Sequence, residues 1–193
     1  MATAPRTRSL GDAASFFSAI RQVTGSLTQA QVNILNLMLV AAGAAGWPVG
    51  WLAYGLATAW HEARFLPQAE WGLGKGRPYA AAGKYGQPQY GRGLVQLTWD
   101  FNYEWADKAL KLNGQLLRNF DLALDPNIAT RILVKGMEDG AFTGRGLGQY
   151  IVSRGTPEAF VNARRIINGT DKAQLIAGYA ERFQAALEKA RWA

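Results

Sequence analysis

The sequence predicts a mainly α-helical α+β domain with a small β-hairpin and long glycine-rich loops. One stretch, from Gln22 to Trp60, contains no Asp, Glu, Lys, Arg or His and is apolar enough to form buried helices. Residue pairs typical of helix starts recur further along the chain. Between residues 67 and 102, by contrast, glycine and proline are frequent, which indicates loops and turns inserted in a helical body.

The uncharged stretch is expected to form two helices. Thr28 and Gln31 have the spacing of a capping box, and the helix that follows is apolar on most faces, so it should be central. Residues 46–48 (Gly-Trp-Pro) predict a break, and a second core helix is expected from this proline to about Ala63. Residues 37–60 are long enough to cross a bilayer, but the break favours two buried helices over a membrane span.

Three more helices are expected in the second half of the chain. Asp125-Pro126 and Thr156-Pro157 each combine an N-cap residue with a proline suited to the first helical position. The last helix is expected from about Asp171, because apolar residues there share one stripe with charges opposite. That stripe consists of Leu175, Ile176, Tyr179, Phe183 and Leu187.

The short run from Leu94 to Trp99 alternates with a period of two residues. Leu94, Gln96 and Thr98 are therefore predicted to face the same side of a strand. This run supplies the predicted hairpin.

The length of 193 residues suits a single domain over residues 1–193, and residues 1–13 are expected to form a flexible N-terminal tail. We expect no separate binding domain and a monomeric protein. The N-terminus has no apolar run after its arginines, so it does not resemble a signal peptide.

The composition excludes several classes of chemistry. The chain has no cysteine, which excludes disulfides, thiolate zinc sites and cysteine nucleophiles. Its one histidine, His61, is a poor basis for a metal site, so no metal and no cofactor are expected. The net charge of +7 favours an anionic partner. The basic residues are scattered, however, which argues against nucleic acid, and we expect no stable insertion into a membrane.

Two carboxylates follow the uncharged stretch. Glu62 lies at the end of an apolar helix, where burial penalises the charged form, and a carboxyl that stays protonated is what a general acid needs. Glu70 comes eight residues later, beyond Pro67. Such a pair can be separated by about 6.5–9.5 Å, the gap that admits a water molecule in an inverting glycosidase. Alternatively, Glu62 forms a buried salt bridge and Glu70 is an ordinary surface acid.

The segment from Tyr90 to Tyr103, YGRGLVQLTWDFNY, resembles the signature of glycoside hydrolase family 19, the chitinases and chitinase-like phage endolysins. The preceding His61-Glu62 and the later segment from Asn162 to Gly169, NARRIING, match two further motifs of that family in the same order. The resemblance covers about residues 14–190 and is closest to the compact, cysteine-free phage and bacterial form. It implies a lysozyme-like fold.

The resemblance also implies roles for individual residues. Glu62 corresponds to the general acid, and Thr98 to the hydroxyl residue that holds the attacking water. Gln96, Asn102 and Asn168 correspond to positions that hydrogen-bond the sugar. Further substrate contacts are expected from residues of the matched motifs, namely Tyr90, Arg92 and His61.

The general base is the point at which this sequence departs from the plant chitinases. In those enzymes the second acid lies much further along the chain, in a disulfide-bearing region that is absent here. The short phage form has an acid eight or nine positions after the first, which Glu70 fits. Asp100 and Glu104 are the alternative candidates.

The expected activity is hydrolysis of β-1,4 bonds between N-acetylated amino sugars. Peptidoglycan is favoured as substrate over chitin, because the motif variants are those of the endolysin branch and the positive charge suits an anionic cell envelope. Such an enzyme would stay in the host cytoplasm until its release. A chitinase with the same machinery and a non-catalytic wall-binding relative remain open as alternatives.

Overall fold

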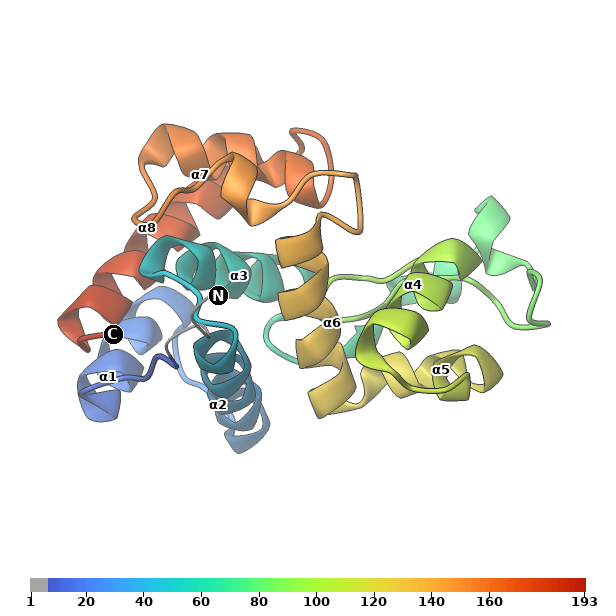
Figure 1. Cartoon of the computed structure of the whole chain (residues 1–193), viewed down its shortest axis with the longest axis horizontal. Coiled ribbons are helices and arrows are strands. Elements are labelled where there is room, and N and C mark those ends of the chain that lie inside the picture. Colours follow the sequence, from blue (N-terminus) through green and yellow to red (C-terminus); the bar gives the residue numbers. More distant parts are fainter. Residues whose placement is uncertain (1–6) are drawn as a thin grey trace, which may run out of the picture.

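The computed structural model describes residues 7–193, which form a helical body and a smaller lobe joined by one central helix (Figure 1). The body contains α1 (Ala13–Thr24), α2 (Gln29–Ala44), α3 (Val49–Ala63), α7 (Pro157–Ala163) and α8 (Ala173–Lys189). The smaller lobe contains α4 (Asp100–Leu110) and α5 (Gln115–Arg118), and α6 (Pro126–Asp139) lies between the two parts.

Short 3₁₀ turns and a two-stranded sheet complete the described chain. Strands β1 (Gln68–Ala69) and β2 (Arg92–Gly93) pair antiparallel, with Gln68 opposite Gly93 and Ala69 opposite Arg92. The 3₁₀ turns are η1 (Trp71–Gly74), η2 (Pro78–Ala80), η3 (Phe120–Leu124), η4 (Leu147–Gln149) and η5 (Arg164–Ile166). The predicted fold class, mainly helical with a small β element, is confirmed.

The predicted helix starts are confirmed by the caps. Thr28 accepts a hydrogen bond from the amide of Gln31, whose side chain accepts one from the amide of Thr28, so the capping box that starts α2 is complete. Asp125 caps α6 and Thr156 caps α7, each followed by proline. The last helix begins at Ala173, two residues after the predicted start.

The central position expected for the uncharged helices is also observed. From Leu52 to Trp60, every residue of α3 is buried. This helix packs along α8, and α6 contacts α2, α3 and α4. The buried side chains form one cluster that continues from the body into the smaller lobe. Among residues 7–193, no helix has both the length and the apolar character needed to cross a bilayer.

The N-terminal tail differs from the prediction where it is described. Arg8 donates its amide proton to the carbonyl of Gly43, and Gly11 and Asp12 donate to that of Ala190. Ser9 exchanges two backbone hydrogen bonds with the C-terminal Ala193. Residues 8–12 are thus fixed between α2 and the C-terminal end, whereas residues 1–6 of the predicted tail lie outside the described residues.

The predicted strand from Leu94 to Trp99 is wrong. Positive φ angles at Gln96 (53°) and Trp99 (72°) turn the chain, and only Leu97 forms an isolated bridge with Arg92. The sheet is built instead by β1 and β2. Alternation of apolar and polar residues predicted an extended backbone, but the run is a turn folded back onto β2.

At the start of α3, the backbone of Gly50 lies close to the backbone of residues 153–155, and a substitution at Gly50 tests this packing. A Cβ atom at Gly50 would lie 2.6 Å from the backbone nitrogen of Gly155 and 2.6 Å from the carbonyl oxygen of Ser153. We expect Gly50→Ala to lower the free energy of unfolding by about 1–3 kcal/mol, measured by urea denaturation, because backbone atoms cannot move aside cheaply.

Gly178→Ala, in the middle of α8, is the matched control. No atom lies within 4 Å of a Cβ there, so the gain in helix propensity should stabilise the protein by about 0.5–1 kcal/mol. Equal unfolding midpoints for Gly50→Ala and the unmodified protein would contradict the packing described.

Candidate active site

A cleft of about 470 Å³ lies between the helical body and the smaller lobe. Its walls come from segments that are far apart in the sequence: the end of β1, the turn before α4, and the loops that follow α6 and η5. The lining residues are Glu70, Tyr79, Val95, Gln96, Leu97, Thr98, Trp99, Asn102, Phe142, Ile167 and Asn168.

The cleft brings together five of the residues predicted from the sequence: Glu70, Gln96, Thr98, Asn102 and Asn168. They come from three regions of the chain, and one of them, Asn168, follows η5 of the helical body. A carboxylate, a hydroxyl and three amides therefore face the same space. This set can bind a polar ligand rich in hydroxyl and amide groups and can remove a proton from it or from water.

The three polar residues around the Leu94–Trp99 turn are held by backbone atoms. Gln96 donates from Nε2 to the carbonyls of Gln68 (3.1 Å) and Gly93 (3.2 Å). Thr98 donates from Oγ1 to the carbonyl of Gln96 (2.8 Å), and Asn102 donates from Nδ2 to that of Thr98 (2.8 Å). All three act as donors in these bonds, which leaves their side-chain oxygens to accept hydrogen bonds from a ligand or water.

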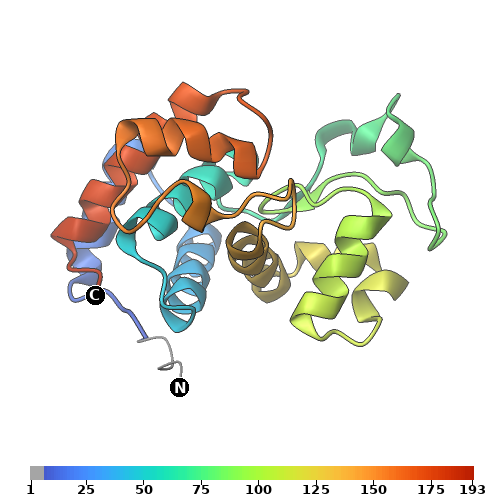
Figure 2. The ribbon, with the colours of Figure 1, turned by 45° about the horizontal axis from the view of Figure 1, so that its top comes forward.

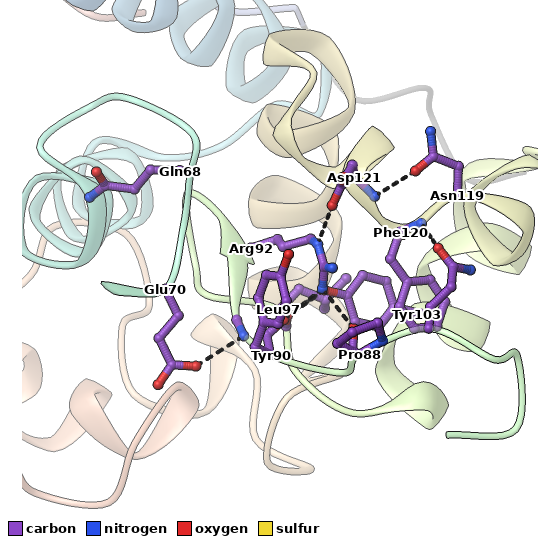
Figure 3. A network of polar contacts seen from close by, with 12 residues as sticks. Gln68, Glu70, Pro88, Tyr90, Arg92, Leu97, Tyr103, Asn119, Phe120 and Asp121 are labelled. Atoms are coloured by element: carbon purple, nitrogen blue, oxygen red, sulfur yellow. Dashed lines mark hydrogen bonds and ion pairs between the residues drawn. The ribbon is translucent and has the colours of Figure 1, made fainter. Parts of the chain in front are cut away.

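Glu70 is fixed in the cleft by two donors. Oε1 accepts a hydrogen bond from the hydroxyl of Tyr79 (2.9 Å), and Oε2 accepts one from the amide of Gly91 (3.2 Å; Figure 3). Burial raises the pKa of Tyr79, and its bond to Glu70 acts in the same direction, so this hydroxyl stays a donor at neutral pH. The carboxylate is therefore oriented before any ligand arrives.

Glu62 occupies a different environment and is not among the residues lining this cleft. It lies near the end of α3, and its Oε1 is 2.8 Å from Nη1 of Arg164. Arg164 is only 2% exposed, and its Nε donates to the carbonyl of Asp171 (2.8 Å); Glu62 is 19% exposed. The salt bridge raised as an alternative from the sequence therefore exists, while the carboxyl of Glu62 keeps some access to solvent.

Sequence reasoning did not identify Arg164 as the partner of Glu62. The nearby Arg64 instead places its guanidinium over the ring of Trp60, at 4.5 Å. The available signal was the position of Arg164 inside the same late motif as Asn168, which pointed to the site without naming the partner.

His61 adjoins Glu62 and is half-buried. Burial lowers the pKa of His61, and the charge of Glu62 opposes this shift only in part. The imidazole is therefore mostly neutral at pH 7 and is available as both donor and acceptor. Among residues 7–193, no three His, Asp or Glu side chains gather where they could hold a metal ion.

Arg92, which was predicted to contact the substrate, is buried in the smaller lobe and does not line the cleft. It is 3% exposed, and its Nε is 2.7 Å from Oδ1 of Asp121. Its Nη1 donates to the carbonyls of Pro88 and Tyr90 and to the hydroxyl of Tyr103, and its guanidinium lies 3.7 Å from the centre of the Tyr90 ring (Figure 3).

Arg92 therefore holds the smaller lobe together, because every one of these contacts is to the protein itself. Tyr90 belongs to the same network, stacked on Arg92, and neither residue is among those lining the cleft. The motif matched from the sequence thus combines cleft residues with structural ones.

The alternative bases lie elsewhere. Asp100 accepts a hydrogen bond from the amide of Lys84, and Glu104 binds Nζ of Lys84 (2.9 Å) and the hydroxyl of Tyr85 (2.8 Å). The hydrogen bond from Lys84 lowers the pKa of Glu104, which keeps this acid ionised within a surface pair. Glu70 is the one of the three candidates that lines the cleft.

The sequence also missed cleft residues. Tyr79 gave no signal, because its role depends on a hydrogen bond formed by a loop. Phe142 lines the cleft beyond α6, and its ring packs against Gly136, where a Cβ atom would come within 2.1 Å of it.

No protein-family profile and no curated protein matches this sequence. Solved structures do. A bacterial family 19 chitinase is 23% identical, with a TM-score of 0.60 over 88% of this chain and 93% of its own. Chitinase C from Streptomyces griseus HUT6037 is also 23% identical, with a TM-score of 0.64 over 89% of this chain and 75% of its own. The chain therefore has the lysozyme-like fold of these family 19 chitinases.

Proposed function

We propose that this protein is a glycoside hydrolase that cleaves β-1,4 bonds in polymers of N-acetylated amino sugars by an inverting acid–base mechanism. The observation that carries the proposal is the gathering of Glu70, Thr98, Gln96, Asn102 and Asn168 around one cleft. The fold shared with family 19 chitinases supports it.

In the proposed mechanism Glu70 is the general base. Its carboxylate is oriented by Tyr79 and Gly91, and both oxygens retain lone pairs for a water molecule. Thr98 holds that water through its hydroxyl oxygen, while Gln96, Asn102 and Asn168 bind the sugar through their amides. The base removes a proton as the water attacks the anomeric carbon.

Glu62 is the proposed general acid. Arg164 binds its Oε1, which leaves Oε2 to carry the proton that passes to the glycosidic oxygen. Arg164 is itself held by the carbonyl of Asp171 and is thus a positioning residue for the acid. The leaving sugar departs with this proton, and the acid is restored from solvent.

We further propose peptidoglycan as the substrate and an endolysin as the biological role. A net charge of +7 would draw the enzyme to an anionic cell wall. Chitin is the second candidate, favoured by the chitinase activity named for the two structural relatives.

Amide variants of the two acids test the mechanism. Glu62→Gln and Glu70→Gln should each lower kcat about 10²–10⁴-fold, because each removes one proton-transfer step. The measurement is release of new reducing ends from purified peptidoglycan, with circular dichroism as the control for folding. Wild-type turnover by either variant would remove that residue from the proposed mechanism.

Thr98 is tested by a matched pair of variants. Thr98→Ala should lower kcat about 10–100-fold through loss of the hydroxyl that holds the water, whereas Thr98→Ser keeps the hydroxyl and should retain most activity. If serine fails as badly as alanine, the hydroxyl is not what matters at this position.

The ion pair of Glu62 and Arg164 is tested by a double-mutant cycle on the free energy of unfolding. Arg164→Gln should cost up to about 3 kcal/mol, since it leaves the partly buried carboxyl group of Glu62 without its hydrogen-bond partner. Adding Glu62→Gln to that variant should recover part of the loss. Strictly additive costs would show that the two side chains do not interact.

The substrate is decided by digesting purified peptidoglycan and chitin oligosaccharides in parallel. Mass spectrometry of the products should show a new reducing end at an amino sugar of peptidoglycan. Strong turnover of chitin with no product from peptidoglycan would reverse the choice between the two polymers.

A further inference from the structure

A second hollow, of about 420 Å³, adjoins the cleft and shares Glu70 with it. Its other lining residues are Trp71, Gly72, Gly74, Lys75 and Arg77. Tyr79 of the cleft packs against this segment, since a Cβ atom at Gly74 would lie 2.8 Å from the Tyr79 ring. The hollow therefore continues the cleft through their shared residue, Glu70. The segment that forms it projects from the smaller lobe (Figure 2).

The segment is ordered by its own backbone. The backbone amides of Leu73, Lys75 and Arg77 donate to the backbone carbonyls of Glu70, Gly72 and Gly74, respectively, at 2.8–2.9 Å. Leu73 has a φ of 50°, which is unfavourable for a branched side chain. Backbone strain of this kind persists only where the surroundings enforce it and is concentrated at binding and catalytic sites.

This ordered turn presents an indole to solvent. Trp71 is 98% exposed and Leu73 is 53% exposed, so two large apolar side chains of one turn face solvent beside the hollow. An exposed indole beside a carbohydrate cleft offers a flat surface for the apolar face of a sugar ring.

Two cations line the same hollow as this indole. Lys75 and Arg77 are exposed, and no ion pair joins either to an acid among the described residues. The one carboxylate of the hollow, Glu70, already accepts hydrogen bonds from Tyr79 and Gly91. The hollow thus carries a surplus of positive charge next to a stacking surface.

We propose that Trp71, Lys75 and Arg77 form a subsite for an amino sugar that carries a carboxylate. The sugar ring lies on Trp71, and its carboxylate is bound by the two cations. Neutral chitin offers no such group, whereas peptidoglycan offers a lactyl carboxylate on stem-free strands and peptide carboxylates on strands with stems. The choice of polymer rests on the proposed function. In this proposal the hollow is what distinguishes peptidoglycan from chitin.

Binding measurements in a hydrolysis-silenced Glu62→Gln background test the subsite. Isothermal titration compares three soluble ligands: chitin oligosaccharide, peptidoglycan strands with stems, and strands from which an amidase has removed the stems. Adding Lys75→Gln and Arg77→Gln should reduce the preference for carboxylated over neutral ligand about tenfold and flatten its dependence on salt. If the Lys75 and Arg77 variant loses its preference for stem-free strands, the bound group is the lactyl carboxylate. If it loses its preference only for strands with stems, the bound group is a peptide carboxylate.

Lys108→Gln with Lys111→Gln is the matched control, because it removes the same charge from two exposed residues of the same lobe. It should leave the preference unchanged. Trp71→Ala should weaken all three ligands, and the part of the tryptophan fluorescence change that disappears in Trp71→Phe should report stacking directly.

An unchanged preference in the Lys75 and Arg77 variant, or an equal change in the control, would overturn the subsite. If Glu62→Gln does not fold, the same comparison of kcat/KM in otherwise unmodified enzyme replaces it. Absence of hydrolysis by the unmodified protein would count against the proposed function alone, since binding preference is measured without turnover.

Discussion

The arrangement of the cleft depends on the short pairing of β1 with β2. Through it, the segment that carries Glu70 is joined to the segment that carries Gln96 and Thr98. The amide of Glu70 donates to the carbonyl of Gly91 (2.7 Å), and the amide of Gly91 donates back to the Glu70 carboxylate (3.2 Å). Gln96 adds a bond to the carbonyl of Gln68 (3.1 Å). A carboxylate and a hydroxyl that are distant in sequence are thus set at fixed positions by a few backbone hydrogen bonds.

Two buried arginines fix the elements on either side of this pairing. Arg92, the buried cation of β2, joins Asp121, Tyr90 and Tyr103, so the strand is anchored in the smaller lobe. On the other side, Arg164 joins the end of α3 to the loop before α8 through Glu62 and the carbonyl of Asp171. The same loop region carries Asn168 into the cleft. Arg92 and Arg164 therefore fix the two walls of the cleft, and the side-chain oxygens of Gln96, Thr98 and Asn102 can still accept hydrogen bonds from a ligand.

The sequence predicted local features well because they depend on neighbouring residues. Caps at Thr28, Asp125 and Thr156 follow from side chains that bond amides two or three residues away. The strand expected over Leu94–Trp99 failed because the positive φ at Gln96 is imposed by the fold around it. Alternation of residue types cannot encode that angle.

Some residues of the site could likewise be predicted from the sequence, and the roles of others could not. The matched motifs identified Gln96, Thr98, Asn102 and Asn168, and the spacing after Glu62 identified Glu70. The structure brings all five around one cleft. Motifs do not separate residues that line a cleft from those that support it, so Arg92 was predicted to touch substrate although it lies inside the lobe. The pairing of Glu62 with Arg164 spans 102 positions and becomes visible only once the chain is folded.

The proposed mechanism requires that Glu70 activate a water that attacks the face of the sugar opposite the acid. The most direct measurement is proton nuclear magnetic resonance of the sugar formed in the first seconds of hydrolysis, before mutarotation. Attack by water in one step on a β-linked substrate predicts that the new reducing end appears first as the α anomer. First appearance of the β anomer would mean a covalent or substrate-assisted route, and the role assigned to Glu70 would be wrong.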